Sequence, residues 1–162
     1  MKSFRFRNHT KIVFGEGALD SLADELRSCE RNILFAYGKG SIKREGIYDA
    51  IIKILVDCGK NVTELSGIMP NPTAEKVREG VKLCKENNID FILAVGGGSV
   101  IDCCKAIAVG AVVDEDFWDV LYKKRDTTPK ALRIGTVLTM VGTGSEMNDS
   151  AVITNGELKV KA

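Results

Sequence analysis

Glycines and small hydroxyl residues follow apolar runs of the sequence at positions where they could hold a phosphate group. Gly96–Ser99 comes directly after the run that ends at Val95, and Gly38–Ser41 follows the run that ends at Tyr37. Glycines let the backbone approach a ligand closely, and unpaired N–H groups at the start of a following helix can bind phosphate oxygens. Because a tight turn before a capped helix needs the same residues, one such segment alone is weak evidence.

Two further segments have the same character. Thr139–Glu146 follows the apolar run that ends at Leu138, and Asn71 adds a carboxamide between two prolines. If the four preceding segments are neighbouring parallel strands, their carboxyl ends line one crevice, where ligands of such sheets bind. The four turns together therefore indicate a nucleotide. Ser99 and Asp102 also have the spacing of a capping box, which predicts that Ser99 caps a helix.

The sequence lacks two common phosphate-binding fingerprints. The Rossmann dinucleotide motif needs a glycine at position 101, which is Ile101 here, and the Gly-Lys-Ser/Thr triplet of a P-loop does not occur. The acidic stretch Asp114–Asp116 lies about where a ribose-binding acid would fall in a Rossmann fold, but it does not follow a strand pattern. We interpret this stretch as a solvated face.

Strand and helix patterns alternate along most of the chain. Apolar runs predict strands over 33–37, 62–65, 91–95 and 134–138, and helical patterns predict helices over about 47–58, 74–84 and 99–110. This alternation is typical of βαβ units, so we predict an α/β fold with a parallel sheet. Phe4–Phe6 and Lys11–Phe14 predict an N-terminal β-hairpin before the first helix. Asn155-Gly156 predicts a second hairpin near the C-terminus.

Length and composition limit the class of protein. The chain has 162 residues, 44% of them hydrophobic, and a net charge of +1. These values fit one soluble globular domain without the basic surface of a nucleic-acid or membrane binder. No apolar run is long enough to span a membrane, and the N-terminus lacks the apolar stretch of a signal peptide. His9 is the only histidine and the five cysteines form no C-x-x-C pair, so we expect no zinc site, reduced thiols and a cytoplasmic protein.

Five motifs occur in order along the chain, namely Val13–Gly17, Tyr37–Lys43, Pro70–Thr73, Gly96–Asp102 and Thr143–Asn148. Together they resemble the iron-containing (group III) alcohol dehydrogenases, specifically the branch of NADPH-dependent butanol dehydrogenases and aldehyde reductases. The resemblance covers essentially the whole chain. It implies that residues 1–162 form an N-terminal dinucleotide-binding domain of the dehydroquinate synthase-like type. The family's C-terminal helical domain is absent from this chain, which stops within a predicted strand.

The resemblance also implies which residues bind the cofactor. The expected set is Gly38, Gly40, Ser41, Asn71, Gly97, Gly98, Ser99, Asp102, Thr139, Thr143, Asn148 and Lys161. Within it, the residues after the third strand would hold the pyrophosphate, and Asp102 would lie beside the ribose on the nicotinamide side. Asn71 and the two threonines would contact the adenosine side and the phosphates. Asn148 and Lys161 would add further polar contacts.

The choice of cofactor depends on position 38. Members of the family that prefer NAD carry an aspartate there, whose carboxylate binds the adenosine ribose and repels a 2′-phosphate. Here the position is a glycine, followed by Lys39, Ser41 and Lys43, which can donate hydrogen bonds to a phosphate. NADP is therefore expected in preference to NAD.

The family's metal ion, Fe²⁺ or Zn²⁺, is held by one aspartate and three histidines of later sequence. We therefore expect no metal ligand and no catalytic residue in this chain. It would be the N-terminal cofactor-binding part of a metal-dependent, NADP-linked enzyme that interconverts a small alcohol and an aldehyde, and it would be inactive on its own. One alternative is a stand-alone nucleotide-binding module without catalysis, and another is a relative of glycerol dehydrogenase or dehydroquinate synthase. The resemblance also implies a homodimer built partly on residues 3–14, where the N-terminal strand pairs with a second subunit.

Overall fold

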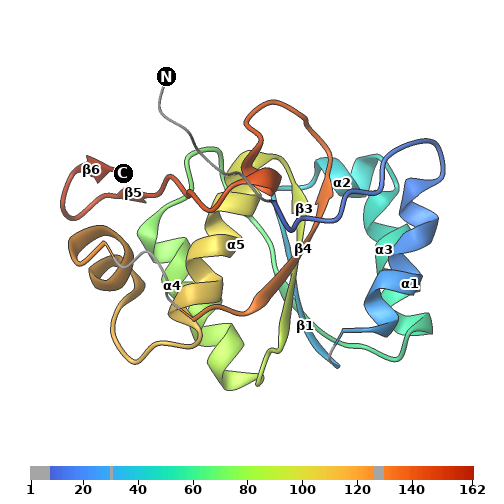
Figure 1. Ribbon diagram of the computed structural model, residues 1–162, viewed down its shortest axis with the longest axis horizontal. Coiled ribbons are helices and arrows are strands. Elements are labelled where there is room, and N and C mark those ends of the chain that lie inside the picture. The colour runs from blue at the N-terminus through green and yellow to red at the C-terminus, as the bar shows by residue number, and fades with distance from the viewer. Residues whose placement is uncertain (1–7, 30, 126–129) are drawn as a thin grey trace.

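Figure 1 shows the computed structural model, which describes residues 8–29, 31–125 and 130–162. Four strands form one parallel sheet in the order β2-β1-β3-β4. They are β1 (Asn32–Tyr37), β2 (Asn61–Leu65), β3 (Phe91–Gly96) and β4 (Arg133–Leu138). Each lies within one residue of the predicted bounds, and the predicted α/β fold with a parallel sheet is confirmed.

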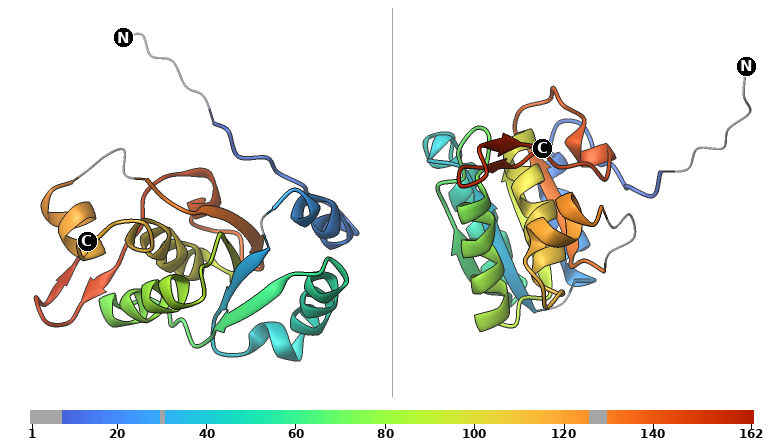
Figure 2. Two further views of the ribbon diagram at one scale, coloured as in Figure 1. Left: turned by 90° about the horizontal axis from the view of Figure 1, so that it is seen from below. Right: turned by 90° about the vertical axis from the view of Figure 1, so that its left-hand side faces the viewer.

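Helices cover both faces of the sheet (Figure 2). α1 (Leu22–Arg27) and α3 (Ile47–Asp57) pack on one face, and α4 (Ala74–Glu86) and α5 (Gly98–Gly110) pack on the other. The connections contain the short elements η1 (Ala18–Ser21), α2 (Ser41–Arg44), η2 (Asp119–Lys123) and η3 (Ser145–Met147). None of the helices in the described ranges is long and apolar enough to cross a membrane.

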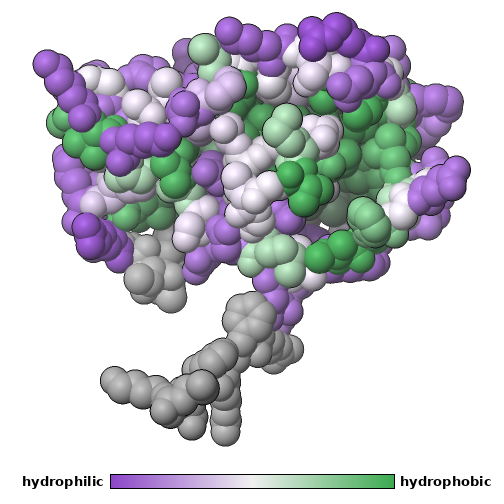
Figure 3. Space-filling model, turned by 90° about the horizontal axis from the view of Figure 1, so that it is seen from above, coloured by the Kyte–Doolittle hydropathy of each residue, from purple (hydrophilic) through white to green (hydrophobic). Residues whose placement is uncertain are grey.

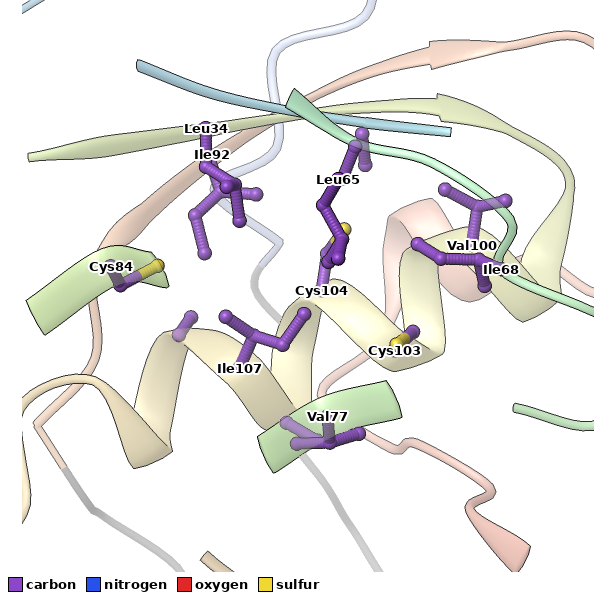
Figure 4. Packing of buried hydrophobic residues seen from close by; sticks show 14 of the residues in the cluster. Leu34, Leu65, Ile68, Val77, Cys84, Ile92, Val100, Cys103, Cys104 and Ile107 are labelled. Atoms are coloured by element: carbon purple, nitrogen blue, oxygen red, sulfur yellow. The ribbon is translucent and has the colours of Figure 1, made fainter. Parts of the chain in front are cut away.

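Alternate side chains of the two central strands enter two separate apolar cores. Leu34 and Ile92 pack with α4 and α5, whereas their neighbours Phe35 and Leu93 pack with α1 and α3. All four side chains are fully buried. Burial on both faces explains why these strands are apolar almost throughout. Figure 4 shows Leu34 and Ile92 facing Ile107 of α5 in the first core.

Three cysteines also belong to this first core. Cys84 of α4 and Cys103 and Cys104 of α5 are buried there (Figure 4). Burial raises the pKa of the Cys84 and Cys103 thiols to about 12, so both stay protonated at neutral pH. Cys29 and Cys58 are half-buried, and all five cysteines are free thiols. The buried three therefore pack as small apolar side chains.

The predicted N-terminal hairpin is not found in the described residues. Phe4–Phe6 lies outside them, and Lys11–Phe14 is irregular chain rather than strand. The apolar side chains of this second segment are exposed, Ile12 by 61% and Phe14 by 94%. Its apolar pattern therefore faces no core of the described chain. Pairing of the N-terminal segment with a second subunit stays a prediction.

The predicted C-terminal hairpin is present, but its turn is longer than the predicted two residues. β5 (Thr154–Asn155) and β6 (Val160–Lys161) pair antiparallel, so the turn is 156–159 rather than Asn155-Gly156. The Asn155 side chain is buried and accepts a hydrogen bond from the backbone within that turn, which holds the residue in the strand. The backbone N–H of Thr154 donates to the carbonyl oxygen of Pro72 at 2.9 Å, so the hairpin docks beside the turn before α4.

Candidate nucleotide-binding site

The strand order places a topological switch point between β1 and β3. From β1 the chain continues to β2 on one side, and from β3 it continues to β4 on the other. Ligands of open parallel sheets bind at such a point, beyond the carboxyl ends of the strands. Gly38–Ser41 follows β1 and Gly97–Ser99 follows β3. The structure therefore brings the two glycine-rich segments to neighbouring strand ends, at the upper edge of the sheet in Figure 1.

The start of α5 differs from the prediction. Gly97, not Ser99, is the N-cap, and the helix begins at Gly98. The prediction that Ser99 caps this helix is wrong, because the extended chain turns into the helix directly after Gly97 and leaves Ser99 inside the first turn. The N-cap makes no side-chain hydrogen bond. The first N–H groups of α5 therefore lack a side-chain cap and suit a phosphate.

The three glycines at positions 96, 97 and 98 differ in what a side chain at each position would meet. A Cβ at Gly96 would lie 2.6 Å from Cγ2 of Val100, and a Cβ at Gly98 would overlap the side chain of Thr143. At Gly97, a Cβ would meet only Met140, at an ordinary distance of 3.5 Å, and the φ of −91° suits any residue. Neither packing nor backbone conformation requires a glycine at position 97. A ligand lying against the backbone there would require one.

The other glycine-rich segment lies beside a cluster of aromatic and charged side chains. The hydroxyls of Tyr37 and Tyr48 both donate to the Glu64 carboxylate, at 2.6 and 2.8 Å. Burial, and to a lesser extent Glu64, raises the pKa of Tyr37 to about 12. The hydrogen bond to Glu64 is the main cause of a raised pKa at Tyr48. Lys43 places its ammonium 4.4 Å from the Tyr48 ring centre and 5.4 Å from that of Tyr37.

This cluster sets the charge next to Gly38. The Glu64 carboxylate is occupied by two phenol hydroxyls, and the segment from Gly38 to Lys43 contains two lysines and no carboxylate. Lys39 and Ser41 are exposed. The end of β1 thus offers positive charge and a hydroxyl to an anion.

A polar network joins α5 to the chain after β4. The Lys105 ammonium donates to Ser145 Oγ at 2.9 Å, to Asn148 Oδ1 at 3.0 Å and to the carbonyl oxygen of Ser150 at 2.8 Å. Asp102 accepts from Ser145 Oγ at 2.6 Å and from the backbone N–H of Val152 at 3.0 Å. The contacts of Asp102 and Asn148 with the dinucleotide stay a prediction, and the structure additionally gives both side chains these partners within the chain.

Sequence reasoning missed Lys105. The sequence feature that could have identified Lys105 is its spacing from Asp102. These two are the only charged residues of α5, and residues three apart share one helix face. Burial lowers the pKa of Lys105, against the opposing effect of nearby acidic groups, of which Asp102 is the strongest. The side chain is thus a partly desolvated cation held by several acceptors.

The remaining predicted residues also lie near the carboxyl ends of the strands. Lys161 donates to Asn71 Oδ1 at 2.6 Å, a contact that joins the docked hairpin to the turn after β2. The backbone N–H of Thr139 donates to the carbonyl oxygen of Gly96 at 3.1 Å, which extends the pairing of β3 and β4. Thr143 lies against Gly98. The structure therefore gathers the expected set around one edge of the sheet.

The acidic stretch Asp114–Asp116 and the aromatic residues after it lie away from the strand ends described above (Figure 1). Trp118 is buried and stacks on Tyr122 with ring centres 4.3 Å apart. Asp116 pairs with Arg78 of α4 at 2.9 Å and is 36% exposed, and the rest of the acidic stretch is exposed. A hollow of about 440 Å³ lies between this stretch and the second half of α4. It involves none of the predicted site residues.

The described residues do not fit a metal ion. Within them, no group of three or more His, Cys, Asp or Glu side chains is placed to hold one. His9, the single histidine, is exposed. A metal implied by the family would therefore need ligands from outside the described residues.

Comparison with known proteins identifies the family. The model of the family described as iron-containing alcohol dehydrogenase matches residues 9–162. The chain belongs to this family. It is 54% identical over 162 residues to a probable NADH-dependent butanol dehydrogenase of Bacillus subtilis, covering 99% of the chain and 41% of the relative. It is 41% identical over 155 residues to an NADPH-dependent aldehyde reductase of Escherichia coli, covering 94% of the chain and 39% of the relative.

A solved structure of this family has the same fold. The crystal structure of an NADH-dependent butanol dehydrogenase from Thermotoga maritima superposes with a TM-score of 0.94 at 45% identity, covering 99% of the chain and 40% of that protein. The chain thus spans about two fifths of the length of these iron-containing alcohol dehydrogenases and corresponds to their N-terminal dinucleotide-binding domain. The rest of the length of these relatives has no counterpart among the 162 residues.

Proposed function

We propose that this chain is the cofactor-binding part of an NADP-linked enzyme that interconverts a small alcohol and an aldehyde. The observation that supports this most is Gly97, a glycine at the switch point that neither packing nor φ requires. The pyrophosphate of the dinucleotide would lie against Gly97–Ser99, where the N-terminus of α5 supplies N–H groups and a favourable dipole. The adenosine end would lie beside Gly38.

The chain's own residues would bind and orient the cofactor. The bound nicotinamide would supply hydride transfer to or from the substrate carbon, which is the cofactor's chemistry. Gly97 and Gly98 would let the phosphates approach the backbone, and Ser99 and Thr143 would add hydroxyl groups near them. Asn71 and Lys161, already hydrogen-bonded to each other, would provide polar groups on the β2 side. No step of the reaction is assigned to a side chain of this chain.

A preference for NADP over NAD is supported by the charges beside β1. Lys39 and Ser41 are exposed, and Lys43 is held over two tyrosine rings close to Gly38. An extra phosphate on the adenosine ribose would be attracted by both lysines. The Bacillus subtilis relative at 54% identity is described as NADH-dependent and the Escherichia coli relative at 41% as NADPH-dependent, so the preference for NADP rests on these charges and not on the relatives.

The proposed compartment is the cytoplasm. All five cysteines are free, and three of them are buried in a core without a disulfide partner. Reduced structural cysteines are typical of a reducing compartment.

Calorimetric titration and a turnover assay on the purified 162-residue chain test this function. We expect NADPH to bind weakly, with a Kd on the order of 0.1–1 mM, because a cofactor site normally buries most of its ligand and the chain supplies only part of the enclosure. We expect no NADPH oxidation with butyraldehyde when Fe²⁺ or Zn²⁺ is added. Absence of NADPH binding at millimolar concentration would contradict the proposed cofactor role. Metal-stimulated NADPH oxidation would contradict the expected inactivity of the isolated chain.

A further inference from the structure

The loop 139–144, between β4 and η3, buries neither of its two large apolar side chains. Seen from above, this face of the molecule has separate apolar patches among polar residues (Figure 3). Within the loop, Met140 is 74% and Val141 is 81% exposed, so burial of these side chains does not hold the loop in place. The hydrogen bonds that hold the loop are found at its two ends.

Both ends of the loop are fixed by hydrogen bonds to the β3–α5 unit. At the start, the backbone N–H of Thr139 donates to the carbonyl oxygen of Gly96. At the end, Ser145 is buried and its hydroxyl joins Lys105 to Asp102. Between these anchors, Thr143 lies against Gly98, the first residue of α5. The loop is thus held across the helix N-terminus.

Lys105 uses its full donor capacity in this anchor. An ammonium group has three N–H donors, and the three acceptors are Ser145 Oγ, Asn148 Oδ1 and the carbonyl oxygen of Ser150. The acceptors belong to one short segment, residues 145–150, which follows the loop directly. Because all three donors are used in this way, Lys105 holds the backbone of residues 145–150 in place and has no donor left for a ligand.

We propose that Lys105 is a positioning residue for dinucleotide binding, which acts by latching residues 145–152 to α5 and so holds the loop 139–144 against the N-terminus of that helix. The binding part of this inference rests on the proposed function. The latch itself does not, because it concerns contacts within the chain. Lys105 therefore influences the affinity for the whole dinucleotide rather than for the 2′-phosphate.

Hydrogen exchange on the unliganded full chain tests the latch without any ligand. In Lys105→Met, we expect faster exchange of the backbone amides of residues 145–152, including Val152, which donates to Asp102. Exchange in the β1 and β3 strands should not change. Lys85→Met is the matched control, because Lys85 of α4 also donates to a backbone carbonyl, that of Val113, far along the chain from the loop. Unchanged exchange at 145–152 in Lys105→Met would overturn the proposal.

Titration of the same variants with NADPH and with NADH tests the effect on binding. We expect Lys105→Met to weaken both dinucleotides by the same factor, about five- to tenfold, because binding would then have to order the loop. Lys105→Arg should recover part of the loss, and Lys85→Met should bind like the wild type. Affinity within twofold of the wild type, or a loss confined to NADPH, would overturn the positioning role.

The two experiments distinguish failure of the proposed function from failure of the latch. If the wild-type chain binds neither dinucleotide, the proposed function fails, and the exchange experiment still decides whether the latch exists. If Lys105→Met does not fold, Ser145→Ala replaces it, because it removes only the hydroxyl that joins Lys105 to Asp102. Ser145→Ala should show the same local increase in exchange and a smaller loss of affinity, and unchanged exchange would again overturn the latch.

Discussion

Replacing Gly97 by leucine should lower the affinity for NADPH by more than about a hundredfold without unfolding the chain. A Cβ at this position meets only Met140 at 3.5 Å, and φ is −91°, so the fold accepts a side chain. The side chain would occupy the space in front of the α5 N-terminus. The pyrophosphate would then lose at least two charged hydrogen bonds of about 1.5–3 kcal/mol each, where 1.4 kcal/mol corresponds to tenfold.

Calorimetric titration with NADPH measures this loss, and thermal unfolding checks the fold. Gly156→Leu is the matched control, because Gly156 lies in the β5–β6 turn with open space around it. We expect the control to bind NADPH like the wild type. Wild-type affinity in Gly97→Leu would mean that the phosphates do not lie at this helix start.

Replacing Gly38 by aspartate should weaken NADPH binding by at least tenfold and leave NADH binding within about threefold. Two like charges about 4 Å apart repel by about 1 kcal/mol in water and about 4 kcal/mol near a protein surface, and the 2′-phosphate carries more than one charge. A Cβ at Gly38 would lie 3.4 Å from the carbonyl oxygen of Ile68, so a shift of a few tenths of an ångström accommodates it.

Gly38→Asn separates charge from shape, because asparagine has nearly the same size as aspartate and no charge. Titration of both variants with NADPH and NADH should show the loss only for the aspartate variant with NADPH, and high salt should reduce it. An equal loss of NADPH affinity in both variants would identify a steric effect. Unchanged NADPH affinity in Gly38→Asp would contradict the placement of the adenosine ribose beside β1.

The strands and long helices were predictable because their causes are local. The run from Phe91 to Val95 is apolar on both faces, and the structure buries both faces of β3 between helices. The predicted helix over 74–84 begins directly after Thr73, whose hydroxyl caps it by accepting a hydrogen bond from the N–H of Lys76. In contrast, Lys11–Phe14 has an apolar pattern without a described partner strand, so its pattern alone could not decide its structure.

The sequence was sufficient to predict which segments form the site, but not which side chains contact each other there. The glycine-rich turns were placed correctly at the strand ends, because strand boundaries follow from apolar runs. The predicted N-cap of α5 was wrong by two residues. A serine that follows three glycines does not show at which of these residues the backbone becomes helical. Lys105 and its acceptors are separated by 40–45 residues, and Lys161 and Asn71 by 90, so only the folded chain shows that they meet.

Hydrogen exchange of the 162-residue chain with and without saturating NADPH tests most directly whether the dinucleotide binds at the carboxyl ends of the strands. We predict slower exchange in the turns after β1, β3 and β4, which include Gly38–Ser41, Gly97–Asp102 and Thr139–Asn148. Exchange around the hollow between the second half of α4 and Asp114–Phe117 should not change. Protection confined to that hollow, or no protection at the strand ends under saturating NADPH, would contradict this placement of the cofactor.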